Sequence, residues 1–424
     1  MPAEARAPAA PTLLADPNFR RYWAGQAISA FGDAFAFVAY PLLVLDSTGS
    51  VAAMGGVSAA AAVSHLVAGV VAGPIVDRSD RRRLMIGCDI GRLVVFSIVP
   101  ILWWTRGPSL IALYVAVVLG SVMGNLFSVA YVTATPDLVD RSRLTEANGR
   151  LQGSQALAFV IGPVLAGIVA SKVGSVWAIG IDALTFGASA LSLAAIRLRR
   201  EGRSVTPSGS AFEGLRFLRG EPQLRAVTIV FVALAILSSG TMAAGILDVI
   251  IYHLRHVLGA GDRAVGFALG LGAVGAVIGA LSAASLRRRF GFGACFVGAT
   301  AIQGVALLFM GTAGLGTGAV TLGVAAATWT AGMSVRGVIT QTLRQELTPE
   351  ALLGRVTAAF WTVAAVMAPV GAALVTRVAE RWGTTLAFRG TGVGVLAVTV
   401  VAIVTVLPAS RRAARARADE APSY

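Results

Sequence analysis

The chain has 424 residues, of which 56% are hydrophobic and only 13% are charged, and its net charge is +14. A water-soluble surface needs roughly a quarter or more of charged residues, so this composition excludes a soluble globular protein. The basic residues stand in short clusters between apolar runs, which is typical of the loops of a membrane protein and argues against nucleic acid as a partner.

The apolar runs predict an all-α, polytopic membrane protein with twelve membrane-spanning helices embedded in a lipid bilayer. Each run is close to the roughly 20 residues that cross a hydrocarbon core of about 30 Å. The expected spans are 22–45, 51–73, 84–104, 110–134, 148–171, 175–196, 226–250, 264–285, 293–313, 317–341, 355–377 and 384–407. No apolar segment of signal-peptide length precedes Pro17, so the first span is expected to direct insertion.

The distribution of basic residues predicts the orientation of these spans. In the loops and tails, 26 Lys and Arg residues fall on the side of the two termini and seven fall on the opposite side. Short loops that are rich in Lys and Arg stay in the cytoplasm. The sequence therefore predicts a multi-pass protein of the plasma membrane with both termini in the cytoplasm.

The two halves of the chain repeat each other. The segment DPNFR at 16–20 returns as EPQLR at 221–225, and Gly73 and Pro163 return as Gly279 and Pro369, each 205 or 206 residues further on. Because each half contains an even number of spans, the copies should run parallel, related by an axis along the membrane normal. We expect a six-helix bundle in residues 1–200, a cytoplasmic linker in 201–222 and a second six-helix bundle in 223–424.

A dense cluster of charge, GPIVDRSDRRRL at 73–84, lies between the second and third spans. Its members are Gly73, Asp77, Arg78, Asp80, Arg81, Arg82 and Arg83. The pattern resembles the loop between spans 2 and 3 of the major facilitator superfamily of secondary transporters, with Asp80 where that family usually has Gly. The resemblance implies that the loop is a latch, whose Asp and Arg groups pair with the opposite half and release during turnover.

Two further expectations follow for this latch. Asp137, after span 4, is a plausible partner for the arginine cluster, since spans 2 and 4 end on the same side of the membrane. The second copy of the loop, around Arg287, lacks an acidic residue equivalent to Asp77. We therefore expect an asymmetric latch that is strong in the first half and weak in the second.

Span 5 contains a glycine and proline pattern formed by Gly153, Gly162, Pro163 and Gly167. It resembles a motif of exporters in the superfamily, although Ala166 stands where a second Gly is common. The proline kinks the helix and the glycines let a neighbouring helix approach closely. The alternative is a kinked and tightly packed helix that does not determine the direction of transport. The loop after span 4, PDLV at 136–139 and RLTEANGR at 143–150, looks like that of the drug- and siderophore-exporter branch.

Ionisable residues inside spans are candidate functional groups, because each costs about 2.5 to 3.5 kcal/mol at mid-membrane. Asp33 lies in the middle of span 1, with no cationic neighbour within one helical turn. It is our first candidate for a protonatable carboxylate or for the counter-ion of a cationic substrate. The alternative is a carboxylate that is permanently paired for structural reasons. Asp182 in span 6 is a second candidate, and Asp248 is expected to be solvated at the membrane surface.

Other polar residues in the spans favour structural roles. Asp89 and Arg92 are three residues apart in span 3, so they share a helix face and predict an internal ion pair. His65 in span 2 is interpreted as a hydrogen-bonded packing residue.

The sequence predicts no cofactor and no enzymatic site. His253 and His256 have metal-ligand spacing, but they have no clustered partner, and Cys88 and Cys295 occupy unrelated positions. No glycine-rich phosphate loop is present, which argues against an ATP-driven pump.

These patterns favour a monomeric, proton-coupled exporter of small, mostly hydrophobic organic compounds of the antibiotic or multidrug type. It would work by alternating access, with Asp33 exchanging a proton for substrate and the 77–83 loop holding the outward-open state. Two alternatives stay open: a metabolite importer on the same fold, and a transport-inactive membrane receptor. The sequence leaves the substrate and the choice between protons and sodium undetermined.

Overall fold

The computed structural model describes residues 13–48, 51–107, 109–198, 212–238, 244–260, 262–313 and 318–419, and within these ranges the regular structure is helical with no strand. The long helices are α1 (Pro17–Thr48), α2 (Val51–Arg78), α3 (Arg81–Arg106), α4 (Leu110–Ala134), α5 (Leu144–Val173), α6 (Ser175–Ala194), α8 (Pro222–Ser238), α10 (Asp262–Met310), α11 (Gly318–Leu347), α12 (Leu353–Trp382) and α13 (Thr384–Asp419). The shorter elements are η1 (Leu13–Ala15), η2 (Thr135–Asp137), η3 (Arg141–Arg143), α7 (Phe212–Gly220), α9 (Ala244–Tyr252), the π-helical turn η5 (His253–Val257) and η6 (Glu350–Leu352). The expected all-α fold class is confirmed.

Local sequence signals set several of the helix ends. Asp80 caps α3, its side chain accepting a hydrogen bond from the backbone N–H of Arg83 at 2.9 Å. The tight connections from α3 to α4, α5 to α6 and α12 to α13 pass through Gly107, Gly174 and Gly383, whose φ angles are 87°, 96° and 85°. Only glycine adopts such angles readily, so these residues stop one helix and allow the next to turn back.

The predicted spans and the helices of the structure do not correspond one to one in the second half of the chain. The predicted span 226–250 is covered by two helices, α8 and α9, and residues 239–243 between them lie outside the described ranges. The predicted spans 264–285 and 293–313 correspond to the two helical segments of α10, which are separated by a kink at Gly291, where φ is 76°. Within the predicted linker, α7 forms a short helix that meets α8 at an angle of 106°.

The membrane-spanning character is visible in length and surface. Among the described residues, six helices are long and apolar enough to cross a membrane, or seven if the bent pair α7 and α8 is counted as one span. Twelve crossings therefore stay a prediction. Large apolar side chains are exposed along the bundle, including Ile111 (79%) and Leu191 (75%). Such a surface requires a lipid environment.

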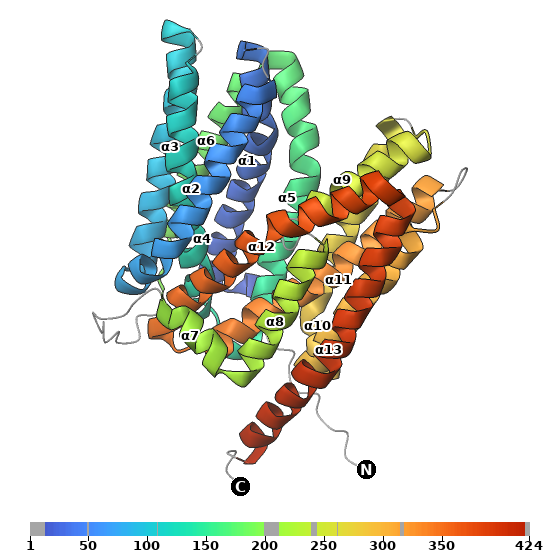
Figure 1. Ribbon diagram of the computed structural model, residues 1–424. Coiled ribbons are helices and arrows are strands. Elements are labelled where there is room, and N and C mark those ends of the chain that lie inside the picture. The colour runs from blue at the N-terminus through green and yellow to red at the C-terminus, as the bar shows by residue number, and fades with distance from the viewer. Residues whose placement is uncertain are drawn as a thin grey trace, which may run out of the picture.

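The helices form two groups that meet at one end of the molecule and diverge toward the other, as Figure 1 shows. Helices α1 to α6 pack together, and α8 to α13 form a second group with its own apolar core around residues such as Phe296 and Phe388. The two groups touch mainly where α5 meets α10 and where α2 meets α12. We call the meeting end, which contains the α2–α3 turn and η6, the closed end.

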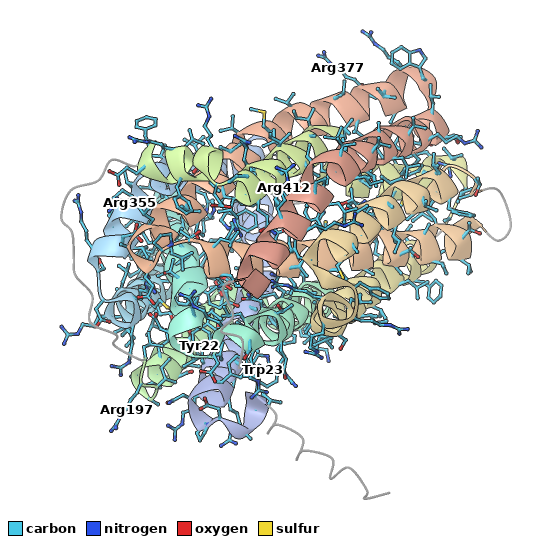
Figure 2. The ribbon with its side chains drawn as sticks, turned by 90° about the horizontal axis from the view of Figure 1, so that it is seen from below. Tyr22, Trp23, Arg197, Arg355, Arg377 and Arg412 are labelled. Atoms are coloured by element: carbon cyan, nitrogen blue, oxygen red, sulfur yellow. The ribbon has the colours of Figure 1, made fainter. Side chains whose placement is uncertain are left out.

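Figure 2 views the molecule from below, toward the closed end. Arg355 and Arg377 lie at opposite ends of α12, and Arg355 is at the end next to the first group of helices. The closed end therefore contains the polar contacts that join the two groups.

Candidate functional site

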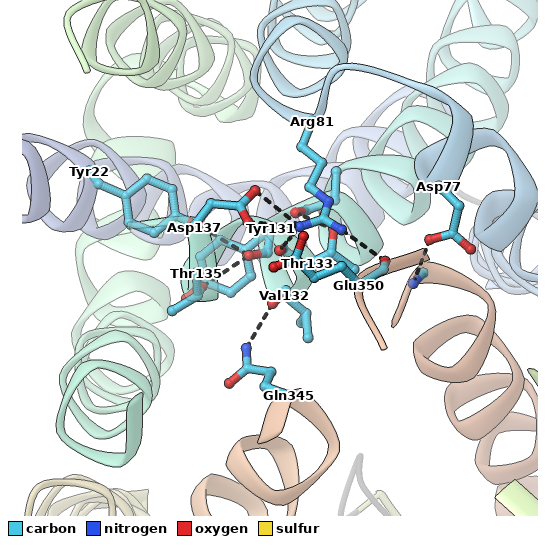
Figure 3. Close-up of polar contacts among 12 residues, drawn as sticks. Tyr22, Asp77, Arg81, Tyr131, Val132, Thr133, Thr135, Asp137, Gln345 and Glu350 are labelled. Carbon is cyan, nitrogen blue, oxygen red and sulfur yellow. Dashed lines mark hydrogen bonds and ion pairs between the residues drawn. The ribbon is translucent and has the colours of Figure 1, made fainter. Parts of the chain in front are cut away.

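Asp77 binds the first turn of a helix in the opposite group. Its Oδ1 accepts a hydrogen bond from Gly354 N at 2.7 Å, and its Oδ2 accepts one from Arg355 N at 3.1 Å (Figure 3). Arg355 Nε also lies 3.3 Å from Asp77 Oδ2. Free backbone N–H groups and the helix dipole make a helix N-terminus a favourable place for a carboxylate. Asp77 thus holds α2 against the start of α12.

Burial changes the acidity of this carboxyl group, which lies beyond the end of the predicted second span. Loss of water outweighs the hydrogen bonds from Gly354 and Arg355, and it raises the pKa of Asp77 to about 6.

Arg81 makes a second connection between the groups. Its Nη1 donates to Thr133 O at 2.6 Å and pairs with Asp137 Oδ2 at 3.0 Å. Its Nη2 donates to the carbonyl oxygen of Glu350, in the opposite group, at 3.2 Å (Figure 3). Asp137 therefore orients a guanidinium group that reaches across the closed end.

The other arginines of the cluster have different surroundings. Arg82 donates to the carbonyl oxygens of Leu193 and Ala194 at 2.8 and 2.5 Å, at the C-terminus of α6, where a positive charge is favourable. Arg78 and Arg83 are exposed. The expectation that the Asp and Arg groups together face the opposite half therefore needs correction for Arg82, which binds within its own half because the end of α6 lies beside it.

Two glycines allow the backbones to approach at this contact. A Cβ atom on Gly73 would lie 2.6 Å from Arg355 Cα, and one on Gly354 would overlap the carboxylate of Asp77. Gly73 of the predicted motif therefore acts by removing bulk where α2 crosses α12.

A layer of amide side chains, which the sequence reading missed, lies beside these contacts. Asn148 Nδ2 donates to Thr342 Oγ1 at 2.9 Å and to Gln345 Oε1 at 2.6 Å, and Gln341 Nε2 donates to Asn148 Oδ1 at 3.0 Å. Gln345 Nε2 also donates to Val132 O at 2.7 Å. The glutamines at the end of an otherwise apolar span were the available signal.

The second copy of the latch is simpler than the first. Arg287 Nη2 pairs with Glu346 Oε2 of its own half at 2.6 Å, and its Nη1 donates one hydrogen bond across to Thr145 Oγ1 at 2.9 Å. Across the interface, Arg287 thus makes one hydrogen bond to a neutral hydroxyl, whereas Asp77 binds two N–H groups and a guanidinium.

The linker helix α7 shares a partner with Asp77. Glu213 pairs with Arg355 Nη1, and Gly214 lies so close to the Arg355 carbonyl that a Cβ would overlap it. Arg355 is therefore held by two carboxylates, one from α2 and one from the linker.

A second polar cluster lies inside the first group of helices. Arg92 Nη2 lies 2.5 Å from Asp89 Oδ1, which confirms the predicted ion pair. Arg92 Nη1 lies 3.9 Å from Asp33 Oδ1, and the guanidinium stacks over Phe186 at 4.0 Å. No cation lies within one helical turn of Asp33 along α1, as the sequence indicates, but Arg92 of α3 approaches it through space. The side chain of Asp33 is 51% exposed, whereas that of Asp89 is fully buried.

Asp182 lies on α6 near the same cluster. Its Oδ2 accepts a hydrogen bond from Tyr40 at 3.2 Å, while its Oδ1 is buried without a partner. A Cβ on Gly32 would lie 2.7 Å from Asp182 Oδ1, so the glycine before Asp33 lets α1 pack directly on this carboxylate. The side chain of Asp248 lies outside the described part of the structure.

The sequence pattern of the Major Facilitator Superfamily matches residues 22–372. The chain belongs to this superfamily. It is accordingly a multi-pass membrane transporter rather than an enzyme.

Several exporters of the superfamily are similar in sequence. The multidrug efflux pump Tap of Mycobacterium tuberculosis is 31% identical over 203 residues, which cover 45% of this chain and 48% of Tap. Macrolide efflux protein A of Streptococcus pyogenes is 27% identical over 222 residues, 50% of this chain and 54% of that protein. In both cases the match spans about half of the relative. The enterobactin exporter EntS of Escherichia coli is 26% identical over 410 residues, 94% of each chain.

Solved structures of the superfamily share the fold. A bacterial homologue of the iron transporter ferroportin in an outward-facing state has a TM-score of 0.71 at 19% identity, over 93% of this chain and 99% of that one. The Escherichia coli fucose:proton symporter FucP has a TM-score of 0.72 at 13% identity, over 91% and 98%.

The glycines of span 5 link two parts of this transporter. Gly153 packs on the opposite half, where its Cβ would lie 3.3 Å from Leu281 and 3.8 Å from Ala280 Cβ, and Gly162 packs directly on Ala34, next to Asp33. The surroundings of Pro163 and Gly167 lie outside the described part of the structure.

The histidines have no shared site. His65 is exposed, and among the described residues its hydrogen bond is to its carbonyl oxygen, from Asn125 Nδ2 at 3.1 Å, so its interpretation as a packing residue is wrong. His253 Nδ1 lies 2.6 Å from Thr384 Oγ1, and the ring of His256 lies tilted against that of Tyr252, with 4.6 Å between the ring centroids. No group of three His, Cys, Asp or Glu side chains in the described ranges is arranged to hold a metal ion.

Proposed function

We propose that this transporter is a proton-coupled exporter of small, mostly hydrophobic organic compounds. Each chain would work as a monomer in the plasma membrane, with both termini and the closed end in the cytoplasm. The similarity to Tap, macrolide efflux protein A and EntS supports export, because all three carry efflux or export in their names.

The observation that carries the proposal is the environment of Asp33. It is a half-exposed carboxylate on a membrane helix, and its nearest cation, Arg92, already has a fully buried partner in Asp89. Removing the charge of Asp33 by a proton leaves the Arg92–Asp89 pair intact. Asp33 is therefore the member of the cluster that can gain and lose a proton without stranding a buried charge.

The closed end supplies the second element of the mechanism. Asp77 and Arg81 hold the halves together at one side while the helices diverge at the other. We place the open side outside the cell, where Asp33 takes up a proton and cargo is released. Breaking the contacts of Asp77 and Arg81 would then open the cytoplasmic side for loading.

The test uses inverted membrane vesicles that contain the full-length chain, with erythromycin and ethidium as probes. An imposed gradient, acidic inside, should drive uptake of at least one probe, and Asp33→Asn should reduce it at least ten-fold. Glu380→Gln, an exposed carboxylate on α12, is the matched control and should transport normally. Unchanged gradient-driven uptake in Asp33→Asn would show that Asp33 does not carry the coupled proton. Uptake driven only by a sodium gradient would show that the coupling ion is sodium and not the proton.

A further inference from the structure

One face of α11 carries hydrogen-bond donors that have no partners. Trp329, Arg336, Thr340 and Arg344 are spaced by seven, four and four residues, which places them on one helix face within about 80°. All four are at least nine-tenths buried, with exposures of 2%, 5%, 1% and 2%. The indole N–H, the Nε and Nη1 of both arginines and the Thr340 hydroxyl are buried without a hydrogen-bond partner. We call this set the α11 donor face.

The walls around the donor face are aromatic. The Arg344 guanidinium lies 3.9 Å above the ring of Phe360 and 5.5 Å from that of Trp361, both on α12. The Arg336 guanidinium lies 5.3 Å from Phe231 on α8. Phe360 is buried, and Trp361 is 37% exposed.

No carboxylate in the described ranges pairs with either arginine. The polar contact of Arg336 is with Gln303 Oε1, at 3.5 Å, which is a long hydrogen bond to a neutral acceptor. Arg92, in the first half, stacks on aromatic rings in the same way but also has Asp89 as a partner. The second half therefore buries the guanidinium groups of Arg336 and Arg344 against aromatic rings, as the first half does with Arg92, but it supplies no carboxylate equivalent to Asp89.

Burial of the Arg336 and Arg344 guanidinium groups is energetically unfavourable unless an anion pairs with them. Arginine stays protonated in proteins, so neither group avoids burial by losing its charge. A cation–π contact offsets only part of the penalty for burying an ion. The missing partner has to accept hydrogen bonds and carry negative charge, because every polar atom of the α11 donor face is a donor or a hydroxyl.

We propose that the α11 donor face binds an acidic group, a carboxylate or a similar oxyanion, carried by the transported compound. The apolar body of that compound would lie against Phe360 and Trp361. Identifying the ligand as cargo rests on the proposed export function; the anion site itself does not.

A matched pair of probes tests the site. Equilibrium dialysis of the purified full-length protein should show 2-naphthoate binding at least ten-fold more tightly than 2-naphthamide, which has the same rings and no charge. Arg336→Gln and Arg344→Gln should each weaken naphthoate binding at least ten-fold. Arg377→Gln, an exposed arginine of α12, should bind normally.

Equal binding of the acid and the amide would overturn the site. If sulfate binds as tightly as naphthoate and displaces it, the site holds an inorganic anion and the assignment to cargo is wrong. An Asp33→Asn variant can lose gradient-driven uptake and still bind naphthoate. That result would show that the anion site is present and that the defect lies in proton coupling.

Thermal unfolding separates binding from a structural role. If the arginines are an unfilled binding site, their replacement by Gln removes uncompensated buried charge, so Tm should stay equal or rise. Naphthoate should raise the Tm of the wild-type protein by several degrees and leave that of Arg344→Gln unchanged. A fall in Tm in both Gln variants, with no shift by naphthoate in the wild type, would show that the arginines stabilise the fold and do not bind an anion.

Discussion

Asp77 combines strong contacts with incomplete electrostatic compensation. It accepts two backbone hydrogen bonds and pairs with Arg355, yet burial raises its pKa to about 6, above the ordinary value of 3.8. Where the closed end separates, water reaches the carboxyl group and the pKa returns toward its ordinary range. The proton therefore binds more tightly to the closed arrangement than to the separated one.

This difference predicts a pH dependence of closure. Because the pKa of Asp77 is raised in the closed form, protonation of Asp77 stabilises that form. The stabilisation is complete below about pH 3.8 and is lost as pH rises through about 6. Lowering the pH from 7.5 to 5.5 should raise the ratio of closed to separated molecules roughly four-fold. Arg83 and Arg288 are exposed residues of opposite halves. Spin labels on cysteines that replace them would report the distance between the two halves by pulsed electron paramagnetic resonance.

Asp77→Asn should abolish the pH response. Asp80→Asn, which keeps the helix cap because Asn caps as well as Asp, should preserve it. A wild-type distance distribution that is identical at the two pH values would contradict the role of Asp77.

At the residue scale, sequence spacing finds partners along one helix and misses partners between helices. The Asp89–Arg92 pair is predictable because three residues separate them on a helix. The approach of Arg92 to Asp33 depends on how α1 and α3 pack, which no local pattern encodes. Arg336 carries one sequence signal, because it is an ionisable residue inside the predicted span 317–341. The lack of partners of Arg336 and Arg344 is visible only in the packed helices.

At the scale of helices, the crossing of α2 and α12 depends on the absence of a side chain at Gly73. Adding a methyl group there places it 2.6 Å from Arg355 Cα, which belongs to the backbone and cannot rotate away. Overpacking of this kind costs about 1 to 3 kcal/mol. Because the contact exists only when the closed end is closed, this cost falls on one conformation.

Gly73→Ala should therefore shift the transporter away from closure by roughly five- to 150-fold, with the same spin-label pair as the measurement. Gly87→Ala is the matched control, since a Cβ on this glycine of α3 meets nothing within 4 Å. If both variants keep the wild-type distances, the contact between α2 and α12 does not limit closure.

Hydrophobicity predicts the positions of the helices but not their interruptions. Most of each predicted span lies in a described helix, because runs of about 20 apolar residues dominate the sequence. The placement of α7 against α12 leaves no comparable signal. The docking of α7 depends on Gly214 meeting the Arg355 carbonyl, a contact that appears only in three dimensions.

At the scale of the whole molecule, the internal repeat predicts parallel halves, but it does not predict which end is closed. The duplication gives each half a similar loop, whereas the structure uses the first copy for Asp77 and Arg81 and the second for the weaker bond of Arg287 to Thr145. In the proposed alternating cycle, closure is a property of one conformation. A single sequence specifies all conformations of that cycle at once.

A disulfide across the closed end tests whether the halves must separate there. The Cβ built on Gly153 lies 3.8 Å from Ala280 Cβ, which is the mean spacing in disulfides, and the native Cys88 and Cys295 are buried. Oxidation of the double variant Gly153→Cys, Ala280→Cys should reduce vesicle uptake of the transported probe at least ten-fold, and dithiothreitol should restore it. Each single variant serves as the control, and the oxidant should leave its uptake unchanged. Normal transport by protein shown to be fully cross-linked would mean that α5 and α10 stay together throughout the cycle, which would overturn the rocking of two rigid halves about this end.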